Sequence, residues 1–302
     1  FKLKKMKKIF SILALMTIFA VNAQETANRF FYELTFKPKK DSTKVDKVMT
    51  ILDITKDKSI YQDYTIPAQD SIIVDIVGKM EKSGVFQDIM KSIRMPKFGY
   101  KISKNYPSMK QFYADQISTK KFGFDEELKY DWKILNEKEK IGEYNTQKAT
   151  TEFGGRKWTA WFSTDLPFQD GPYKFYGLPG LIVKIEDSQN NYSWLLKGNK
   201  KIENYSELTE ADKINAKYGM SSSVTPITKE KFEKTYETYK QDPLGEFRQY
   251  MTPEAMSRPM PGGSMTFGEY IKNQEKVAKD FFNANDNPIE ISEAKTDAKK
   301  KK

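Results

Sequence analysis

Residues 144–163 read YNTQKATTEFGGRKWTAWFS, and this stretch is the strongest indication of the fold. Polar and apolar side chains alternate on both sides of Gly154-Gly155, as they do along half-buried strands. Both glycines can adopt the positive φ angles that a two-residue hairpin turn requires. The stretch therefore predicts an antiparallel hairpin with one strand over Tyr144–Phe153 and the other over Arg156–Ser163.

Similar alternation extends outward from this hairpin in both directions. Aromatic residues make up 14% of the chain, and Tyr and Phe favour the half-buried surface of a sheet. The pattern predicts an α+β fold whose core is a curved, antiparallel β-sheet. The further predicted strands are Arg29–Lys37, Val48–Ile54, Ile60–Ile66, short runs between Tyr100 and Leu135, Leu181–Glu186 and Tyr192–Lys197.

Helical periodicity is confined to an insertion and to the C-terminal third of the chain. Apolar residues in 72–95 follow a helical period that Gly84 interrupts, so this insertion is predicted to be mainly helical. After residue 203 the pattern is again helical, with a charged amphipathic helix over Thr228–Lys240. The Met-, Pro- and Gly-rich stretch Met251–Gly263 is predicted to be a loop.

Thr266 and Glu269 form a capping-box pattern that opens a last helix through Phe282. Its predicted apolar stripe consists of Phe267, Tyr270, Ile271, Ala278 and Phe281. The chain thus divides into a β-rich core over residues 24–203 and a helical part over residues 204–285, which is expected to pack on the sheet.

The N-terminal residues 1–23 have the three regions of a cleavable secretory signal peptide. Two lysines follow Met6, which is the expected true start. An apolar run of 13 residues, Ile9–Val21, comes next, and small or modest side chains up to Ala23 form the expected cleavage site. As a helix such a run spans about 20 Å, too short for a hydrocarbon core of about 30 Å. We expect Sec-dependent export, cleavage before Gln24, and a soluble protein that is periplasmic, outer-membrane-associated or extracellular.

The formal net charge of +10 lies mostly at the two ends of the chain. Residues 1–23 carry five Lys and no acid, and residues 294–302 carry five Lys and one Asp. The rest therefore holds 51 − 10 = 41 basic and 41 − 1 = 40 acidic residues. This balance argues against nucleic acid as a partner. The Lys-rich tail over residues 286–302 is predicted to be disordered.

The chain contains neither Cys nor His. Nucleophile systems built on Ser-His-Asp or Cys-His are therefore excluded, as are His-ligated zinc sites. We predict no metal site, no cofactor and no catalytic residue, although calcium held by carboxylates stays open. Any catalysis would depend on Asp, Glu, Lys, Tyr or Ser.

Residues 171–182 read GPYKFYGLPGLI and predict a tight corner that leads into the strand starting at Leu181. Pro179 presets the φ of the second position of a turn, and Gly180 can supply the positive φ of the third, which is the type II pattern. Gly177 would permit a close backbone approach just before the turn. A structural role is favoured over a ligand cradle, because Pro179 lacks an amide donor and no helix follows.

These residues resemble the GLPGLI family, exported proteins of Bacteroidota whose molecular function is not established. The string that carries the resemblance is Gly177-Leu178-Pro179-Gly180-Leu181-Ile182. Further similar segments are Lys148–Thr151, Phe153–Arg156, Trp158–Phe162, Gly171-Pro172 with Lys174-Phe175, and Leu52–Ile54 with Ser59. Many relatives carry a Cys where this chain has Thr146 or its neighbour, so no thiol role applies here. The resemblance implies the cell envelope and brings no catalytic residues.

Three functions remain open for an exported protein of this composition. The favoured one is a non-catalytic binding or interaction module for an apolar ligand or an outer-membrane partner. Another is a structural protein that docks on an outer-membrane complex through loop 251–263. A curved sheet with a helix-covered concave face would offer an apolar pocket. The alternative is a carboxylate-dependent hydrolase acting on envelope or glycan substrates, and its candidate acids are Asp165, Asp170, Glu186 and Asp187.

The candidate ligand- or partner-binding residues are Arg156, Trp158 and Trp161. The two Trp residues lie on opposite faces of one strand, so neither face is expected to be simply solvent. Arg156 follows the Gly-Gly turn among aromatic residues and has two interpretations. It either pairs with a buried carboxylate and fixes the hairpin, which we favour, or it receives an anion.

Overall fold

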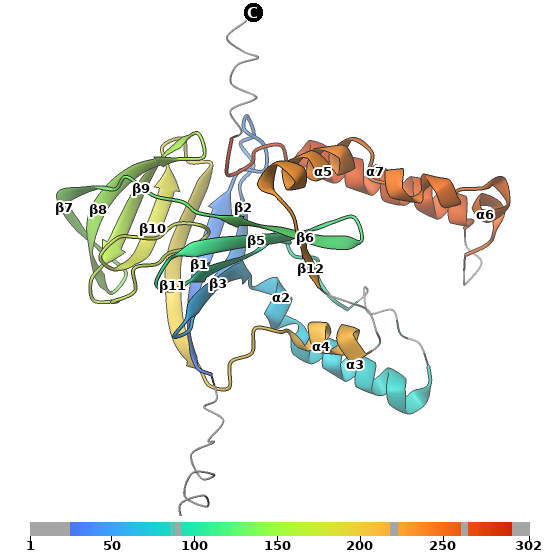
Figure 1. The fold of residues 1–302 in the computed structure, drawn as a ribbon, viewed down its shortest axis with the longest axis horizontal. Helices are drawn as coiled ribbons and strands as arrows, with labels where there is room; N and C mark the ends of the chain where they lie inside the picture. Colours follow the sequence, from blue (N-terminus) through green and yellow to red (C-terminus); the bar gives the residue numbers. More distant parts are fainter. Residues whose placement is uncertain (1–24, 86, 88–91, 218–222, 261–264, 292–302) are drawn as a thin grey trace, which may run out of the picture.

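The computed structural model describes residues 25–85, 87, 92–217, 223–260 and 265–291. Within them, twelve strands form one sheet in the order β12-β6-β5-β4-β3-β2-β1-β11-β10-β9-β8-β7. The predicted signal peptide and most of the Lys-rich tail lie outside the described residues. Figure 1 shows the sheet curving strongly, so that β5 and β6 cross in front of β1, β3 and β11. The predicted antiparallel, curved sheet is confirmed.

Every neighbouring pair in the sheet is antiparallel except β12 with β6, which is parallel. The strands are β1 (Ala27–Phe36), β2 (Asp46–Ile54), β3 (Lys58–Asp63), β4 (Lys101–Asn105), β5 (Lys110–Ile117), β6 (Lys120–Glu126), β7 (Lys133–Ile141), β8 (Tyr144–Phe153), β9 (Arg156–Ser163), β10 (Leu181–Asp187), β11 (Tyr192–Ile202) and β12 (Val224–Pro226). The hairpin of β8 and β9 has the predicted bounds, and Gly154 and Gly155 both have positive φ, 57° and 71°.

The helices fall into two groups along the chain, one between β3 and β4 and one after β11. The first is α2 (Thr65–Ala68) and α3 (Asp70–Ser83), and the second is α4 (Glu210–Lys217), α5 (Lys229–Gln241), the 3-10 helix η2 (Gly245–Tyr250), α6 (Pro253–Ser257) and α7 (Phe267–Ala284). None of the described helices is long and apolar enough to cross a membrane.

Three predicted boundaries in these regions are wrong. The helix of the insertion ends at Ser83, because Gly84 takes the left-handed conformation at φ 68° and closes it. The third strand ends at Asp63 rather than at residue 66, and α2 follows. The stretch 251–263 is not all loop, since Thr252 caps the short helix α6 by accepting a hydrogen bond from the amide of Ala255.

Helices α5, η2, α6 and α7, in residues 229–260 and 265–284, form a projection that we call the arm (Figure 1). At its base Phe232 of α5 packs edge-on against Phe124 and Tyr113 of the sheet. Helix α7 contacts α5 and α6, and its Phe282 packs on Tyr236 and Tyr239 of α5. The capping box at the start of α7 is confirmed.

A long loop, rather than helices, packs against the concave face of the curved sheet. Residues 164–180, which we call the signature loop, contribute Tyr173, Phe175 and Leu178 to the main hydrophobic core. Phe175 packs edge-on against Trp158 of β9 at 4.8 Å, while Tyr173 contacts Tyr61 of β3. The loop thus touches strands from both halves of the sheet, which places it on the concave face where an apolar pocket was expected.

Candidate functional site

Arg156 begins β9 and is almost fully buried, with protein partners on all three of its nitrogen atoms. Its Nη1 donates to Oδ2 of Asp187 at 3.1 Å. Its Nε and Nη2 donate to the main-chain oxygens of Ile289 and Pro288, at 2.9 and 2.7 Å, and the guanidinium lies 5.3 Å from the centre of the Tyr192 ring. This is the carboxylate-paired, stacked Arg of the favoured interpretation.

Asp187 organises the turn between β10 and β11. Its Oδ1 accepts hydrogen bonds from the amides of Asn191 and Tyr192 at 2.6 and 2.7 Å, and Oδ2 accepts from Arg156. The side chain is only 1% exposed. Its oxygens accept hydrogen bonds from the amides of the turn and from the buried Arg156, so the buried carboxylate has partners on both oxygens. This arrangement explains Asp187 by structure and leaves it no access to a substrate.

The two Trp residues of β9 have different surroundings. Trp158 is buried among aromatic rings, and its Nε1 donates to the main-chain oxygen of Phe153 at 2.9 Å. Trp161 is half-buried on the other face, where the Lys148 ammonium lies 5.9 Å from its ring centre. The predicted placement on opposite faces holds, and of the two only Trp161 offers surface to a partner.

The glycines of the signature loop have roles opposite to those predicted. The positive φ, 94°, belongs to Gly177, and Gly180 is not in the left-handed region, so the type II turn at Pro179-Gly180 is wrong. Gly180 is instead the position of close approach. A Cβ there would lie 2.1 Å from the main-chain oxygen of Ser163, at the point where Leu181 pairs with Ser163.

A buried ion pair ties the signature loop to β4. Lys104 Nζ lies 2.5 Å from Oδ1 of Asp170, and both side chains are at most 1% exposed. Lys104 also donates to the main-chain oxygens of Gly171 and Phe175, and the Tyr106 hydroxyl donates to Oδ2 of Asp170. Burial lowers the pKa of Lys104, while Asp170 opposes that shift. With its lone pairs taken up in this way, Asp170 holds the loop in place.

A second buried cation, Lys174, lies at the centre of the signature loop. Its Nζ is 2.6 Å from carboxylate oxygens of both Glu126 and Glu290. Burial alone would raise the pKa of Glu126, but Lys174 and Lys229 lower it overall. Sequence reasoning missed this network, and its one signal was a lysine inside the aromatic run 173–176.

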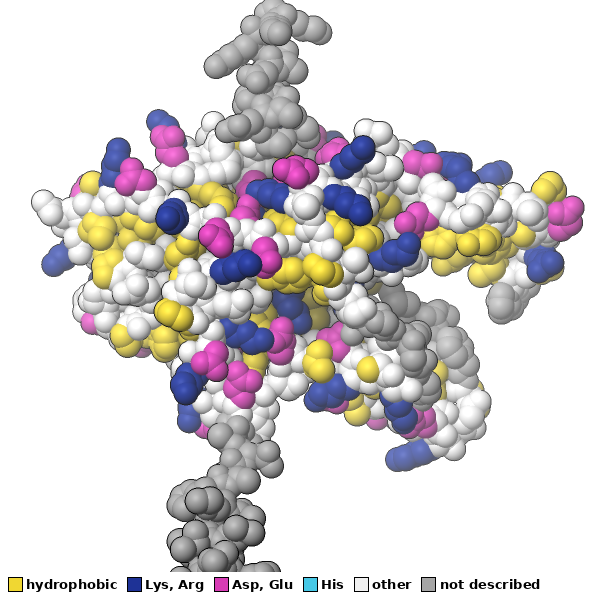
Figure 2. Space-filling view, viewed as in Figure 1, with side chains coloured by type: hydrophobic (Ala, Val, Ile, Leu, Met, Phe, Trp, Pro, Cys, Tyr) yellow, Lys and Arg dark blue, Asp and Glu magenta, His cyan; other side chains and the backbone are white. Residues whose placement is uncertain are grey.

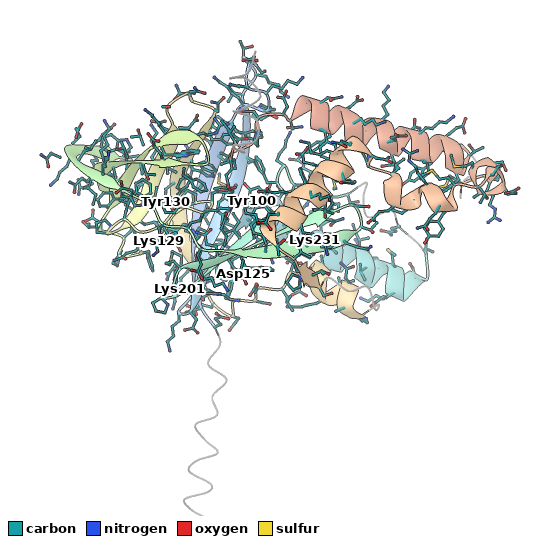
Figure 3. The ribbon with its side chains drawn as sticks, turned by 45° about the horizontal axis from the view of Figure 1, so that its top comes forward. Tyr100, Asp125, Lys129, Tyr130, Lys201 and Lys231 are labelled. Carbon is teal, nitrogen blue, oxygen red and sulfur yellow. The ribbon has the colours of Figure 1, made fainter. Side chains whose placement is uncertain are left out.

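Tyr100, which directly precedes β4, and Tyr130, which lies between β6 and β7, both contact the signature loop, and both are labelled in Figure 3. The Tyr100 ring lies 5.7 Å from that of Tyr173, and the Tyr130 ring lies 5.7 Å from that of Phe175. The Tyr130 hydroxyl donates to the main-chain oxygen of Lys174 at 3.0 Å. The loop is therefore enclosed by rings on both sides.

The four acids proposed for a hydrolase do not form a catalytic pair. Asp170 and Asp187 are engaged in the two separate buried ion pairs described above, and Glu186 pairs with Lys184 at 2.8 Å. Asp165 is exposed. In the part of the chain that the structure describes, no three His, Cys, Asp or Glu residues gather as metal ligands would.

Among the acids of the described residues, Asp115 is the one whose pKa is raised to a value near neutrality. Burial raises the pKa of Asp115 to about 6, against hydrogen bonds from the Gln116 amide and the Tyr113 hydroxyl. Those groups lie 2.8 and 3.4 Å away. A lone carboxylate of this kind can hold a proton, but a glycosidase needs two facing carboxyl groups.

Apolar side chains are exposed along the arm. Tyr270, Val277 and Phe281 of α7 are 38%, 63% and 49% exposed, and their spacing puts them on one face of the helix. Tyr270 and Phe281 belong to the predicted apolar stripe of this helix. Figure 2 shows a row of hydrophobic side chains along the arm, beyond the charged surface of the body. Single exposed apolar residues are ordinary, but a row of them on a projection indicates an interaction surface.

Comparison with known proteins gives a short match to one family model and a distant structural similarity. Residues 154–184 match the family model described as a protein of unknown function (Porph_ging). No curated protein matches this chain. Solved structures of PNGF-II in the C2 and P21 space groups are 16% identical to this chain and have TM-scores of 0.47 and 0.46. The match covers 72% of this chain, which spans about a third of the PNGF-II chain (33% and 34%).

Proposed function

Residues 154–184 carry the signature of the GLPGLI (Porph_ging) family, and on that premise we propose that this chain is an exported, non-catalytic interaction module. The sheet and the signature loop form its rigid body, and the arm carries the surface that a partner binds. The partner we propose is a protein of the outer membrane, consistent with the envelope setting that the family resemblance implies.

The observation that carries this proposal is the exposed face of α7. Tyr270, Val277 and Phe281 share that face, and Tyr250 at the end of η2 is 65% exposed. Burying such side chains against a partner contributes about 25 cal/mol for each Å² of apolar surface removed from water. Aromatic side chains of this kind are frequent anchors at interfaces.

The state of the acids supports binding rather than turnover. An acid/base enzyme keeps its proton donor and its base accessible to the substrate. Here Asp170 and Asp187 are buried and paired with Lys104 and Arg156, and Glu186 pairs with Lys184 on the same strand. The hydrolase alternative has no specific observation in its favour.

Site-specific photocrosslinking in the native cell tests the proposal. A photoreactive amino acid at position 277 reports contacts of the arm, and the same group at Ile134 of β7, which is 48% exposed, is the matched control. We expect one discrete adduct at position 277 and none at position 134. An adduct at neither position, or the same adduct at both, would contradict docking on the arm.

Export is part of the same proposal and has its own test. N-terminal sequencing of the protein from the envelope fraction should begin at Gln24. Recovery of the chain with its N-terminal segment intact would remove the premise of an envelope partner.

A further inference from the structure

The last described residues of the chain, Asn287–Ile291, form an irregular segment with a bend at Ile289-Glu290, and this segment packs on the Gly-Gly turn of β8 and β9. We call this segment the strap. Asn287 and Ile289 are buried, at 5% and 6% exposure, while Pro288 is exposed. The strap belongs to none of the named strands, so it is held mainly by side chains of the body.

Arg156 makes three contacts with the main chain and side chain of the strap. Its Nε and Nη2 donate to the oxygens of Ile289 and Pro288, and Nη2 also donates to Oδ1 of Asn287 at 2.8 Å. The Tyr192 hydroxyl donates to the main-chain oxygen of Asn287. Three successive carbonyl groups of the strap are therefore bound by two side chains.

The side chains of Asn287 and Glu290 are bound specifically. The Asn287 amide donates to the main-chain oxygen of Lys37 at 2.9 Å and to Oδ1 of Asn191 at 3.1 Å. The Glu290 carboxylate accepts from the Tyr173 hydroxyl at 2.6 Å and pairs with Lys174 at 2.6 Å. The body thus recognises an amide at one end of the strap and a carboxylate three residues later.

The glycines of the family signature make room for the strap. A Cβ on Gly154 would lie 2.9 Å from Cγ of Glu290, and one on Gly155 would lie 3.2 Å from Cβ of Ile291. In addition, the amide of Ile291 donates to the oxygen of Gly154 at 2.8 Å. The glycine pair therefore serves two purposes, since it forms the hairpin turn and admits the strap against the backbone.

Each receptor side chain is also fixed by contacts that do not involve the strap. Arg156 is held by Asp187 and the Tyr192 ring, and Lys174 is held by Glu126. The Tyr173 ring stacks on that of Trp194 at 6.0 Å. A site whose groups are positioned in advance binds without a large ordering cost, and none of these contacts depends on a strap residue.

We propose that Gly154, Gly155, Arg156, Tyr173, Lys174 and Tyr192 form a peptide-binding site, and that the strap is an exchangeable ligand bound to it within the chain. The ligand is a short peptide with Asn, Pro, an aliphatic residue and an acid in succession. This site lies next to the base of the arm, where Lys229 Nζ of α5 is 3.9 Å from an oxygen of Glu290. The proposal goes beyond the proposed function, which concerns the exposed face of α7. It also gives the family signature a binding role toward a peptide rather than toward a free anion.

A nicked full-length chain tests the proposal. A protease recognition sequence inserted between Asn285 and Asp286, both exposed, allows cleavage that leaves every residue present. A fluorescent peptide of residues 286–292 is then added, and its exchange with the bound fragment is followed by anisotropy. Peptides with Asn287→Ala or Glu290→Gln probe the two specific contacts, and Asp286→Asn is the matched control outside the site.

We expect saturable exchange, binding at least tenfold weaker for the Asn287→Ala and Glu290→Gln peptides, and unchanged binding for the Asp286→Asn peptide. Three results would overturn the proposal. The peptide fails to exchange into nicked protein that keeps its melting curve, all the peptides bind equally, or the body unfolds when the cleaved fragment leaves. In that last case the strap is an integral part of the core.

Discussion

The Cβ position of Gly180 lies 2.1 Å from the main-chain oxygen of Ser163, so no side chain fits where the signature loop enters β10. The next residue, Leu181, pairs with Ser163 in the sheet. A methyl group at position 180 must therefore displace two strands rather than one flexible side chain. This contact gives the second glycine of the family string a packing role.

Gly180→Ala should accordingly lower the free energy of unfolding by about 1–3 kcal/mol, the range for overpacking. Gly198→Ala is the control, since a Cβ there meets no atom within 4 Å. Chemical denaturation of both variants measures the difference. Equal stability of the two variants would show that the loop can relax around the added methyl group.

The local parts of the fold were predictable, and the reason is the short range of the signals. The hairpin of β8 and β9 follows from alternation and from two adjacent glycines, and α7 begins where Thr266 and Glu269 cap it. The misassigned turn at Pro179-Gly180 shows the limit. Its glycine is required by a strand 17 residues earlier, at Ser163, and no local pattern reports such a contact.

The buried charges were not predictable for the same reason. Lys104 lies on an alternating strand and pairs with Asp170, 66 residues away, so its position alone gave no sign of burial. Glu290 lies within the segment predicted as a disordered tail, yet it contacts Lys174 across 116 residues. An Asn-Pro pair followed by alternating Ile residues was the only signal for the strap.

Trp158 and Trp161 should differ sharply when truncated. Trp158→Ala removes a buried indole, 1% exposed, and should cost about 3–5 kcal/mol of stability. Trp161→Ala, on the half-buried face, should cost about 1 kcal/mol. Thermal and denaturant unfolding of the two variants give the comparison, and similar costs would mean that the two faces are packed alike.

Asp187 and Glu186 provide an adjacent pair for testing the structural role of the acids. Asp187→Asn leaves the buried Arg156 without its carboxylate and should cost about 3–5 kcal/mol. Glu186→Gln breaks a partly exposed pair with Lys184 and should stay within about 1 kcal/mol. Loss of an enzymatic activity in Glu186→Gln, with stability intact, would instead revive the hydrolase alternative.

Asp115 should make the stability depend on pH. Burial raises the pKa of Asp115 to about 6 in the folded protein, above the usual value of about 3.9 in an unfolded chain. The folded state then binds more protons between these values, so this group lowers the free energy of unfolding as pH rises from about 4 to about 6. Asp115→Asn removes this loss.

The stability of Asp115→Asn relative to the original chain should therefore grow across that window. The gain should reach about 3 kcal/mol at pH 7, since the shift is about two pKa units and each unit corresponds to about 1.4 kcal/mol. Denaturant titrations of both proteins at a series of pH values supply the comparison. A difference that does not change with pH would show that Asp115 does not carry the raised pKa.

The affinity of the arm for its partner tests the central claim most directly. The triple variant Tyr270→Ser/Val277→Ser/Phe281→Ser removes the exposed apolar face of α7 and buries no new group. Its binding to the protein captured at position 277 should be at least tenfold weaker, because each lost anchor of this kind costs about 1 kcal/mol or more. The triple variant should keep the melting temperature of the original chain. The Ile134→Ser control should keep the original affinity. Full affinity in the triple variant would contradict docking on the arm.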